Sequence, residues 1–249
     1  MLELPEKQKK IMRRRRLGAP PSTIIVPPFD VAHNVWAFDP DGIAAAQFVA
    51  GPTGTITTPT KTQGTPSFYT FGASDTITFG DALDTTWTTA TGFTLYFCLK
   101  PSSGDLAQAN APVWSKALET ELILNASQAD FYTYYAGGAT NYTRYSWPVG
   151  QFVAGNKYVV AITFDATQAR ASRVVMYKNA SVTGVGVTPA NVGTDGTIAD
   201  TAAVMVLGNR SGLTNPITVS SYAYAYNTVH SAGTVASITS WLQTTKGWV

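Results

Sequence analysis

The sequence predicts an all-β fold, a two-sheet antiparallel sandwich with an extended N-terminal arm and one short C-terminal helix. Threonine, valine, tyrosine, phenylalanine and glycine are abundant and only 13% of the 249 residues are charged, a composition that favours strands over helices. Alternating apolar stretches recur along the chain, with turn residues between them. Helical spacing of apolar residues is strong only near the C-terminus.

The chain divides by charge into an arm, residues 1–28, and a domain, residues 29–249. The first sixteen residues hold seven basic and two acidic side chains, a net charge of +5, whereas the rest has ten basic and thirteen acidic ones, a net charge of −3. One domain suits this length, since sandwiches routinely reach about 200–250 residues. The domain's charge disfavours nucleic acid as its partner. No apolar stretch is long enough to span a membrane.

The arm has the composition of a docking peptide. Residues 1–17 could form a short basic helix, and the proline-rich residues after them are expected to be extended. The docking candidates are an arginine run and an apolar triplet: Arg13, Arg14, Arg15, Arg16, Ile24, Ile25 and Val26. Guanidinium groups pair with carboxylates and the triplet suits a groove or sheet edge, so we expect anchoring on another protein. Packaged nucleic acid and a solvated terminus are the alternatives, although base recognition is disfavoured without aromatic residues.

Residues 157–182 give the clearest strand signal and predict a hairpin at the centre of the sandwich. Its two arms, residues 157–165 and 172–181, are rich in β-branched and aromatic residues and flank a short polar connection. In the first arm alternation separates Tyr158, Val160, Ile162 and Phe164 from Val159, Ala161 and Thr163. A strand that is apolar on one face and small on the other suits a central position.

Further strands are predicted on both sides of this hairpin. They lie at residues 36–38, 43–49, 67–71, 76–79, 92–100, 113–116, 121–125, 130–135, 141–147, 203–208 and 217–226. In residues 92–100, alternation places Phe93, Leu95, Phe97 and Leu99 on the face opposite Tyr96 and Cys98. Alternation likewise places Tyr222, Tyr224 and Tyr226 opposite Ala223 and Ala225.

One helix is predicted near the C-terminus. Ser231 is a typical N-cap residue, and Val235, Ile238, Trp241 and Leu242 then recur at helical spacing before Gly247. We expect this helix to pack Trp241 and Leu242 on the end or edge of the sandwich.

The order of these stretches resembles the concanavalin A-like lectin and glucanase jelly roll, in particular its laminin G-like branch. The matching pieces are residues 67–79, 93–97, 157–165, 176–179, 206–208 and 226–231. They are similar to that family's aromatic strands, its strand ending in Asp, its Tyr-x-Asn turn, its Leu-Gly strand end and its Tyr-Asn-x-x-x-Ser helix start. The resemblance spans roughly residues 60–247 and implies a jelly-roll sandwich. The family typically has glycine where this chain has Ala180, so we expect that turn to differ.

A jelly roll behind a short basic arm also resembles bacteriophage virion proteins, by association at the level of the fold. This resemblance implies a non-enzymatic structural protein of the virion that decorates the head or belongs to the tail or a fibre. Its partners would be other virion proteins, bound through the arm, and further copies of itself in a homo-oligomer. Assembly would take place in the host cytoplasm.

The sequence offers no convincing catalytic residue. Glycosidases of this fold need closely spaced carboxylates, and the one close pair, Glu119 and Glu121, lacks the third carboxylate and is expected to lie on a solvated strand edge. The two histidines, His33 and His230, are far apart in the sequence and no Gly-x-Ser-x-Gly accompanies them, so a serine triad has little support. These histidines and Cys98 do not form a zinc pattern. We expect no enzymatic activity, with a glycoside hydrolase as the distant alternative.

Calcium is the cofactor that the resemblance suggests, because laminin G-like domains often bind it through loop Asp and Asn oxygens. The candidates at loops and strand ends are Asp39, Asp41, Asp75, Asp165 and Asn209. None belongs to a dense ligand loop of the kind that calcium sites use. We therefore interpret them as polar turn residues and expect no metal and no other cofactor.

The best candidate for a binding site is the aromatic hairpin of residues 130–147, which turns through Gly137 and Gly138. Its candidate residues are Tyr132, Tyr134, Tyr142, Arg144, Tyr145 and Trp147. The rings could stack on sugars while Arg144 binds hydroxyl or carboxylate groups. This interpretation gives the alternative function, a carbohydrate-binding module for host-surface glycan. The competing interpretation is that one face of the hairpin fills the core and the other packs on a neighbouring subunit.

Overall fold

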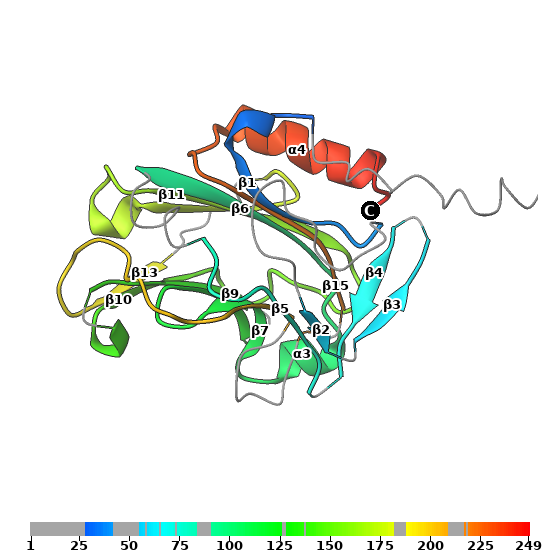
Figure 1. The fold of residues 1–249 in the computed structure, drawn as a ribbon, viewed down its shortest axis with the longest axis horizontal. Coiled ribbons are helices and arrows are strands. Elements are labelled where there is room, and N and C mark those ends of the chain that lie inside the picture. Colours follow the sequence, from blue (N-terminus) through cyan, green and yellow to red (C-terminus); the bar gives the residue numbers. More distant parts are fainter. Residues whose placement is uncertain are drawn as a thin grey trace, which may run out of the picture.

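The computed structural model describes residues 28–41, 55–57, 59–64, 66–72, 74–83, 91–125, 128–136, 138–181, 188–208, 217 and 219–249. They form two antiparallel sheets stacked face to face, with a helix across the outer side of one sheet (Figure 1). The predicted two-sheet sandwich is therefore confirmed. The arginine run and the apolar triplet of the arm, the strand predicted at residues 43–49 and Asn209 lie outside the described residues.

The first sheet has seven strands in the order β12-β11-β6-β15-β4-β3, and β1 also pairs with β15. Their bounds are β1 Asn34–Phe38, β3 Thr60–Thr62, β4 Phe68–Thr70, β6 Gly92–Leu99, β11 Tyr158–Asp165, β12 Val174–Lys178 and β15 Val219–Tyr226. Strands β6 and β15 form the centre of this sheet, and each lies on a stretch that the sequence predicts as a strand.

The second sheet has eight strands in the order β13-β10-β9-β8-β7-β14-β5-β2. Their bounds are β2 Thr55–Thr57, β5 Thr76–Thr78, β7 Ala111–Lys116, β8 Thr120–Asn125, β9 Gln128–Tyr134, β10 Tyr142–Ser146, β13 Thr188–Val192 and β14 Met205–Leu207. The sequence did not predict β2, β3 or β13, which are short or polar.

Short helical turns complete the described elements. They are α3 Ser103–Ala107 and the 3-10 turns η1 Val31–His33, η2 Gly138–Thr140 and η3 Arg170–Ser172. In α3 the Ser102 hydroxyl accepts from the Asp105 amide at 3.1 Å, and the Asp105 carboxylate accepts from the Ser102 amide at 2.6 Å. This reciprocal capping box starts α3 shortly after the end of β6.

The hairpin predicted at residues 157–182 forms as β11 and β12, but its predicted central position is wrong. Among the described strands β12 pairs only with β11, so the hairpin lies at the edge of the seven-stranded sheet. The face assignment is confirmed, since Tyr158 and Val160 lie in the core between the sheets while Val159 and Ala161 lie under the C-terminal helix. Cover by that helix, rather than a central position, buries the second face of β11.

Aromatic side chains fill the core between the two sheets. The Trp36 ring lies 5.1 Å from that of Phe79 and 5.3 Å from that of Trp114, and Phe93 stacks on Phe164 at 4.9 Å between ring centroids. The predicted inner face of β6 is confirmed, with Phe93, Leu95, Phe97 and Leu99 in this core. Burying each such side chain contributes about 1.5–3 kcal/mol, so the core is the main source of stability.

Helix α4, Ala232–Thr244, lies across the outer face of the seven-stranded sheet rather than on the end or edge of the sandwich (Figure 1). Its predicted cap is confirmed, because the Ser231 hydroxyl accepts from the Thr234 amide at 3.2 Å. The reason for its place is a second apolar layer on the outside of this sheet, which holds Tyr96, Cys98, Val159, Ala161, Tyr222, Tyr224 and Tyr226. Val235, Ile238 and Leu242 cover that layer and are fully buried.

A tight turn follows β12 and places an alanine in the left-handed region. Asn179 has φ 49° and Ala180 has φ 65°. The amide of Lys178 donates to the carbonyl of Ser181 at 3.0 Å, and the amide of Ser181 donates back at 3.1 Å. Positive φ at both central residues defines the type I′ turn, which glycine suits best. Ala180, at the resembled family's glycine position, is therefore strained by about 1–2 kcal/mol.

Both histidines of the chain bind one carboxylate, although they are nearly two hundred residues apart. Asp30 accepts from His33 through one oxygen and lies 2.9 Å from His230 Nε2 through the other. The second ring nitrogen of His230 lies 2.8 Å from the Tyr96 hydroxyl, and its ring packs on Tyr226. Burial lowers the pKa of His230, and Asp30 only partly opposes this shift. The cluster joins the start of the domain to the loop before α4.

We expect Ala180→Gly to stabilise the domain by about 1 kcal/mol, because glycine adopts a positive φ without steric strain. Urea unfolding followed by fluorescence measures the change. The matched control is Ala169→Gly, since Ala169 is exposed and has φ −57° and should lose stability through chain entropy. Equal effects of the two substitutions would contradict strain at Ala180.

Acid should destabilise the domain through His230. Its pKa is lowered in the folded state, so below about pH 6.5 the unfolded chain binds a proton that the folded state rejects, and stability falls by up to about 1.4 kcal/mol per pH unit. Urea midpoints between pH 7.5 and 5.5 measure this slope. In His230→Gln the slope should flatten, whereas Tyr96→Phe, which retains the imidazole, should keep it. Parallel slopes in the wild type and His230→Gln would contradict the assignment.

Candidate functional site

The aromatic hairpin forms as β9 and β10, and strand alternation divides its six predicted residues into two groups. Tyr145 and Trp147 point inward and lie in the core between the sheets. The other four share the outer face of the eight-stranded sheet, and we call them the tyrosine platform: Tyr132, Tyr134, Tyr142 and Arg144. The prediction that all six form one site is therefore wrong for Tyr145 and Trp147.

The rings of the tyrosine platform pack against one another across the two strands. Tyr142 lies opposite Tyr134 and Arg144 lies opposite Tyr132 in the register. The centroid of the Tyr132 ring lies 6.0 Å from that of Tyr134 and 5.9 Å from that of Tyr142, and the last two rings are 5.7 Å apart. Tyr132, Tyr142 and Arg144 remain partly exposed. The platform is a preassembled aromatic surface with one cation on it.

Strand β13 and Arg170 fix the backbone below the platform. β13 pairs with β10 over its whole length. The Arg170 guanidinium donates to the carbonyls of Tyr142 at 2.8 Å and Val192 at 2.7 Å and to the Thr143 hydroxyl at 2.8 Å. It also lies 4.9 Å from the centre of the Tyr135 ring. No local sequence pattern marks this arginine, because its partners come from two other segments.

Glu119 and Glu121 are fully buried, so their predicted place on a solvated strand edge is wrong. Strand β8 lies inside the sheet between β7 and β9. Glu121 points to the platform side, where it accepts from the Ser115 hydroxyl at 2.9 Å and from the Tyr134 hydroxyl at 3.0 Å. Glu119 instead binds the Lys116 ammonium at 2.8 Å, and burial raises its pKa. The two carboxylates serve different partners and do not form a pair.

Asp130 is a second buried carboxylate under the platform, two residues before Tyr132. Its Oδ1 accepts from the amide of the Gln128 side chain at 3.1 Å, while its Oδ2 has no hydrogen-bond partner among the described residues. A hydrogen bond with Tyr132 raises the pKa of Arg144, burial opposes it, and the negative charge of Asp130 adds to the increase. Sequence reasoning missed Asp130, although its position two residues before Tyr132 places it on the same face.

The calcium candidates within the described part of the chain already have protein partners. The Lys246 ammonium lies 2.7 Å from an Asp39 oxygen and 2.9 Å from an Asp41 oxygen. Burial raises the pKa of Asp39 in spite of this ion pair. Asp75 accepts from the Gly72 amide at 2.6 Å, and Asp165 accepts from Thr167. These contacts agree with the interpretation as turn and loop residues, with a lysine as the cation of the Asp39 cluster.

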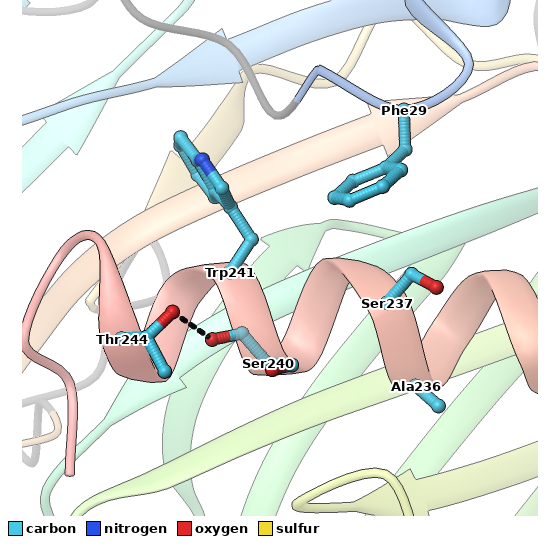
Figure 2. Close-up of a pocket in the computed structure, with 6 residues that line it drawn as sticks. All are labelled: Phe29, Ala236, Ser237, Ser240, Trp241 and Thr244. Carbon is cyan, nitrogen blue, oxygen red and sulfur yellow. Dashed lines mark hydrogen bonds between the residues drawn. The ribbon is translucent and has the colours of Figure 1, made fainter.

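An open groove lies on the opposite side of the sandwich, between α4 and the start of the domain. It is lined by Phe29, Ala236, Ser237, Ser240, Trp241 and Thr244 (Figure 2). The Thr244 hydroxyl donates to the Ser240 carbonyl at 2.8 Å, so part of its polar lining is already bonded. None of the residues that line this groove carries a titratable side chain.

The described residues show neither a group of metal ligands nor a reactive thiol. No three His, Cys, Asp or Glu side chains of those residues gather into a group that could hold a metal ion. Cys98 is buried in β6, and burial raises the pKa of its thiol well above the usual value, which makes the thiol a weak nucleophile. Neither described α-helix is long and apolar enough to cross a membrane.

Comparison with known proteins finds a likeness in fold alone. No protein-family model matches the sequence, and no curated protein matches it. Solved structures do match: the botulinum neurotoxin serotype D binding domain (TM-score 0.61, 9% identity, 84% of this chain and 51% of that chain), the receptor-binding domain of the botulinum neurotoxin C/D mosaic serotype (0.63, 10%, 84% and 51%) and the binding domain of Paraclostridial Mosquitocidal Protein 1 (0.64, 11%, 84% and 52%).

This chain spans about half the length of those binding domains. At identities near 10% the likeness concerns the path of the backbone and not the residues of any site. The chain therefore has a jelly-roll β-sandwich fold of the kind found in toxin binding domains.

Proposed function

We propose that this chain is a non-enzymatic binding domain that recognises glycan through the tyrosine platform. The observation that carries the proposal is the platform itself, three tyrosine rings within 6.0 Å of one another and an arginine on one sheet face. Aromatic rings present a negative face, on which the C–H groups of a sugar ring can stack. Arg144 and the outward tyrosine hydroxyls supply hydrogen bonds for the sugar hydroxyls.

Preorganisation supports this proposal. The Tyr134 hydroxyl is held by Glu121, and Arg170 holds the backbone of β10 at Tyr142. Side chains that are ordered before binding lose little conformational entropy when the ligand arrives.

The similar solved structures give independent support. They are binding domains of toxins, and some are described as receptor-binding domains. A shared fold does not carry a function by itself, but these relatives favour a binding role over a catalytic one. Within the jelly rolls we assign the chain to the concanavalin A-like, laminin G-like branch, on the motifs between residues 67 and 231.

We also propose that residues 1–28 anchor the domain to a bacteriophage particle, as part of the head, the tail or a fibre. This proposal depends on the basic and apolar composition of the arm, and no described contact bears on it. In such a particle the glycan would belong to the host surface. A homo-oligomer that covers the tyrosine platform is the competing role for the same residues.

Truncating the platform should weaken glycan binding. On a glycan array, Tyr142→Ala and Arg144→Ala should each lower the affinity for the best ligand by about three- to tenfold, the value of one aromatic or hydrogen-bond contact. The matched control is Val175→Ala, which truncates an exposed side chain on the other sheet. Trp147→Ala is unsuitable, because this buried ring would create a core cavity.

Two outcomes would contradict glycan binding at the platform. One is a wild-type protein that binds no glycan at high concentration. The other is a platform variant that binds as well as Val175→Ala does. Light scattering of the same variants separates the oligomer role, since loss of an interface would lower the molecular mass instead.

Deleting residues 1–28 should leave a folded domain that no longer enters particles. Residues 1–28 are basic and proline-rich, a composition with little apolar surface to bury in a core, so circular dichroism and the melting temperature should change little. Incorporation is measured by assembling particles with the full-length and the truncated chain. Particles that contain the truncated chain would contradict the anchoring role.

A further inference from the structure

The charged side chains in and beneath the tyrosine platform determine which class of sugar it can bind. On the outward positions of β7, β8, β9, β10 and β13 the charged side chains are Glu121, Asp130 and Arg144. The outward neighbours at the register positions around them are uncharged: Ser115, Ile123, Ser146, Thr188, Ala190 and Val192. The face thus carries two carboxylates and one guanidinium, an excess of negative charge.

The carboxylates of Glu121 and Asp130 can act on a ligand electrostatically without direct contact. Both are fully buried, whereas Arg144 is partly exposed above them. Glu121 is held by Ser115 and Tyr134, and Asp130 has one oxygen held by Gln128. Buried charges are screened less than exposed ones, so a ligand at Arg144 meets the field of all three groups.

A ligand carboxylate would bind Arg144 against the repulsion of these two buried anions. Asp130 lies two residues before Tyr132, which faces Arg144 across β9 and β10, and its negative charge adds to the raised pKa of Arg144 and of Tyr132. A neutral sugar gains the donors of Arg144 and the tyrosine hydroxyls without this repulsion. Specificity of this kind comes from an unfavourable contact built against the competing ligand.

We infer that the tyrosine platform selects neutral sugars over acidic ones, and that buried Asp130 sets this selection by opposing the charge of Arg144. The inference rests on the proposed function, since it names the ligand class of the same site. Asp130 is a positioning and specificity residue, because its side chain is covered and does not reach the ligand.

The test compares neutral hexose oligosaccharides with the same oligosaccharides oxidised at C6 to uronic acids. The wild-type full chain should bind the neutral series at least about tenfold more tightly. In Asp130→Asn, which keeps an oxygen for Gln128, the ratio of the two affinities should shift about tenfold toward the acidic series. A merely structural role would weaken both series equally and leave the ratio unchanged.

Glu121→Gln is the second variant and should shift the ratio in the same direction. Its amide oxygen keeps an acceptor for one of the two hydroxyls, of Ser115 or of Tyr134, and its amide nitrogen can donate to the other hydroxyl oxygen. It also decides the case if Asp130→Asn fails to fold. A wild-type preference for the uronic acids would overturn the inference and leave the proposed function intact. An unchanged ratio in both variants would overturn the role of the buried charges. Binding of neither series would overturn the proposed function itself.

Discussion

Burial of the seven-stranded sheet on both faces is the constraint on which the rest of the structure depends. Strands β6, β11 and β15 are apolar on the side of the second sheet and also on the outer side. Strand geometry sends alternate residues to opposite faces, so such strands need cover twice. The second sheet supplies one cover. Helix α4 supplies the other, and the ion pairs of Lys246 with Asp39 and Asp41 hold the segment after that helix against the sheet.

The two sheets differ in what their outer faces can do. The outer face of the seven-stranded sheet is occupied by its own helix, which leaves it little freedom to bind a ligand (Figure 1). The outer face of the eight-stranded sheet instead carries the tyrosine platform, in which Tyr132, Tyr142 and Arg144 remain partly exposed. Under the proposed function, ligand recognition would belong to the eight-stranded sheet, while the seven-stranded sheet packs against the helix.

Local periodicity predicted the described strands other than β2, β3 and β13, together with the faces of β6, β11 and β15 and the cap of α4, because each depends on residues close in sequence. The same rule would have separated Tyr132 and Arg144 from Tyr145 and Trp147. Contacts between distant segments could not be predicted this way. The binding of His230 to Asp30, the pairing of Lys246 with Asp39 and the burial of Glu121 all depend on which segments become neighbours. The strand propensity of single residues does not tell which segments become neighbours.

The position of β15 in the chain has a consequence for biosynthesis. It is the strand that joins β1, β4 and β6, yet its residues are among the last of the sheet to be translated. Until they emerge, β1 has no partner in the described sheet and β6 has only β11. Apolar strands then remain unpaired on the nascent chain. Pairing of strands that are far apart in the sequence is also slow. The order of the strands therefore leaves apolar strand edges unpaired until β15 has been made, a state that favours aggregation.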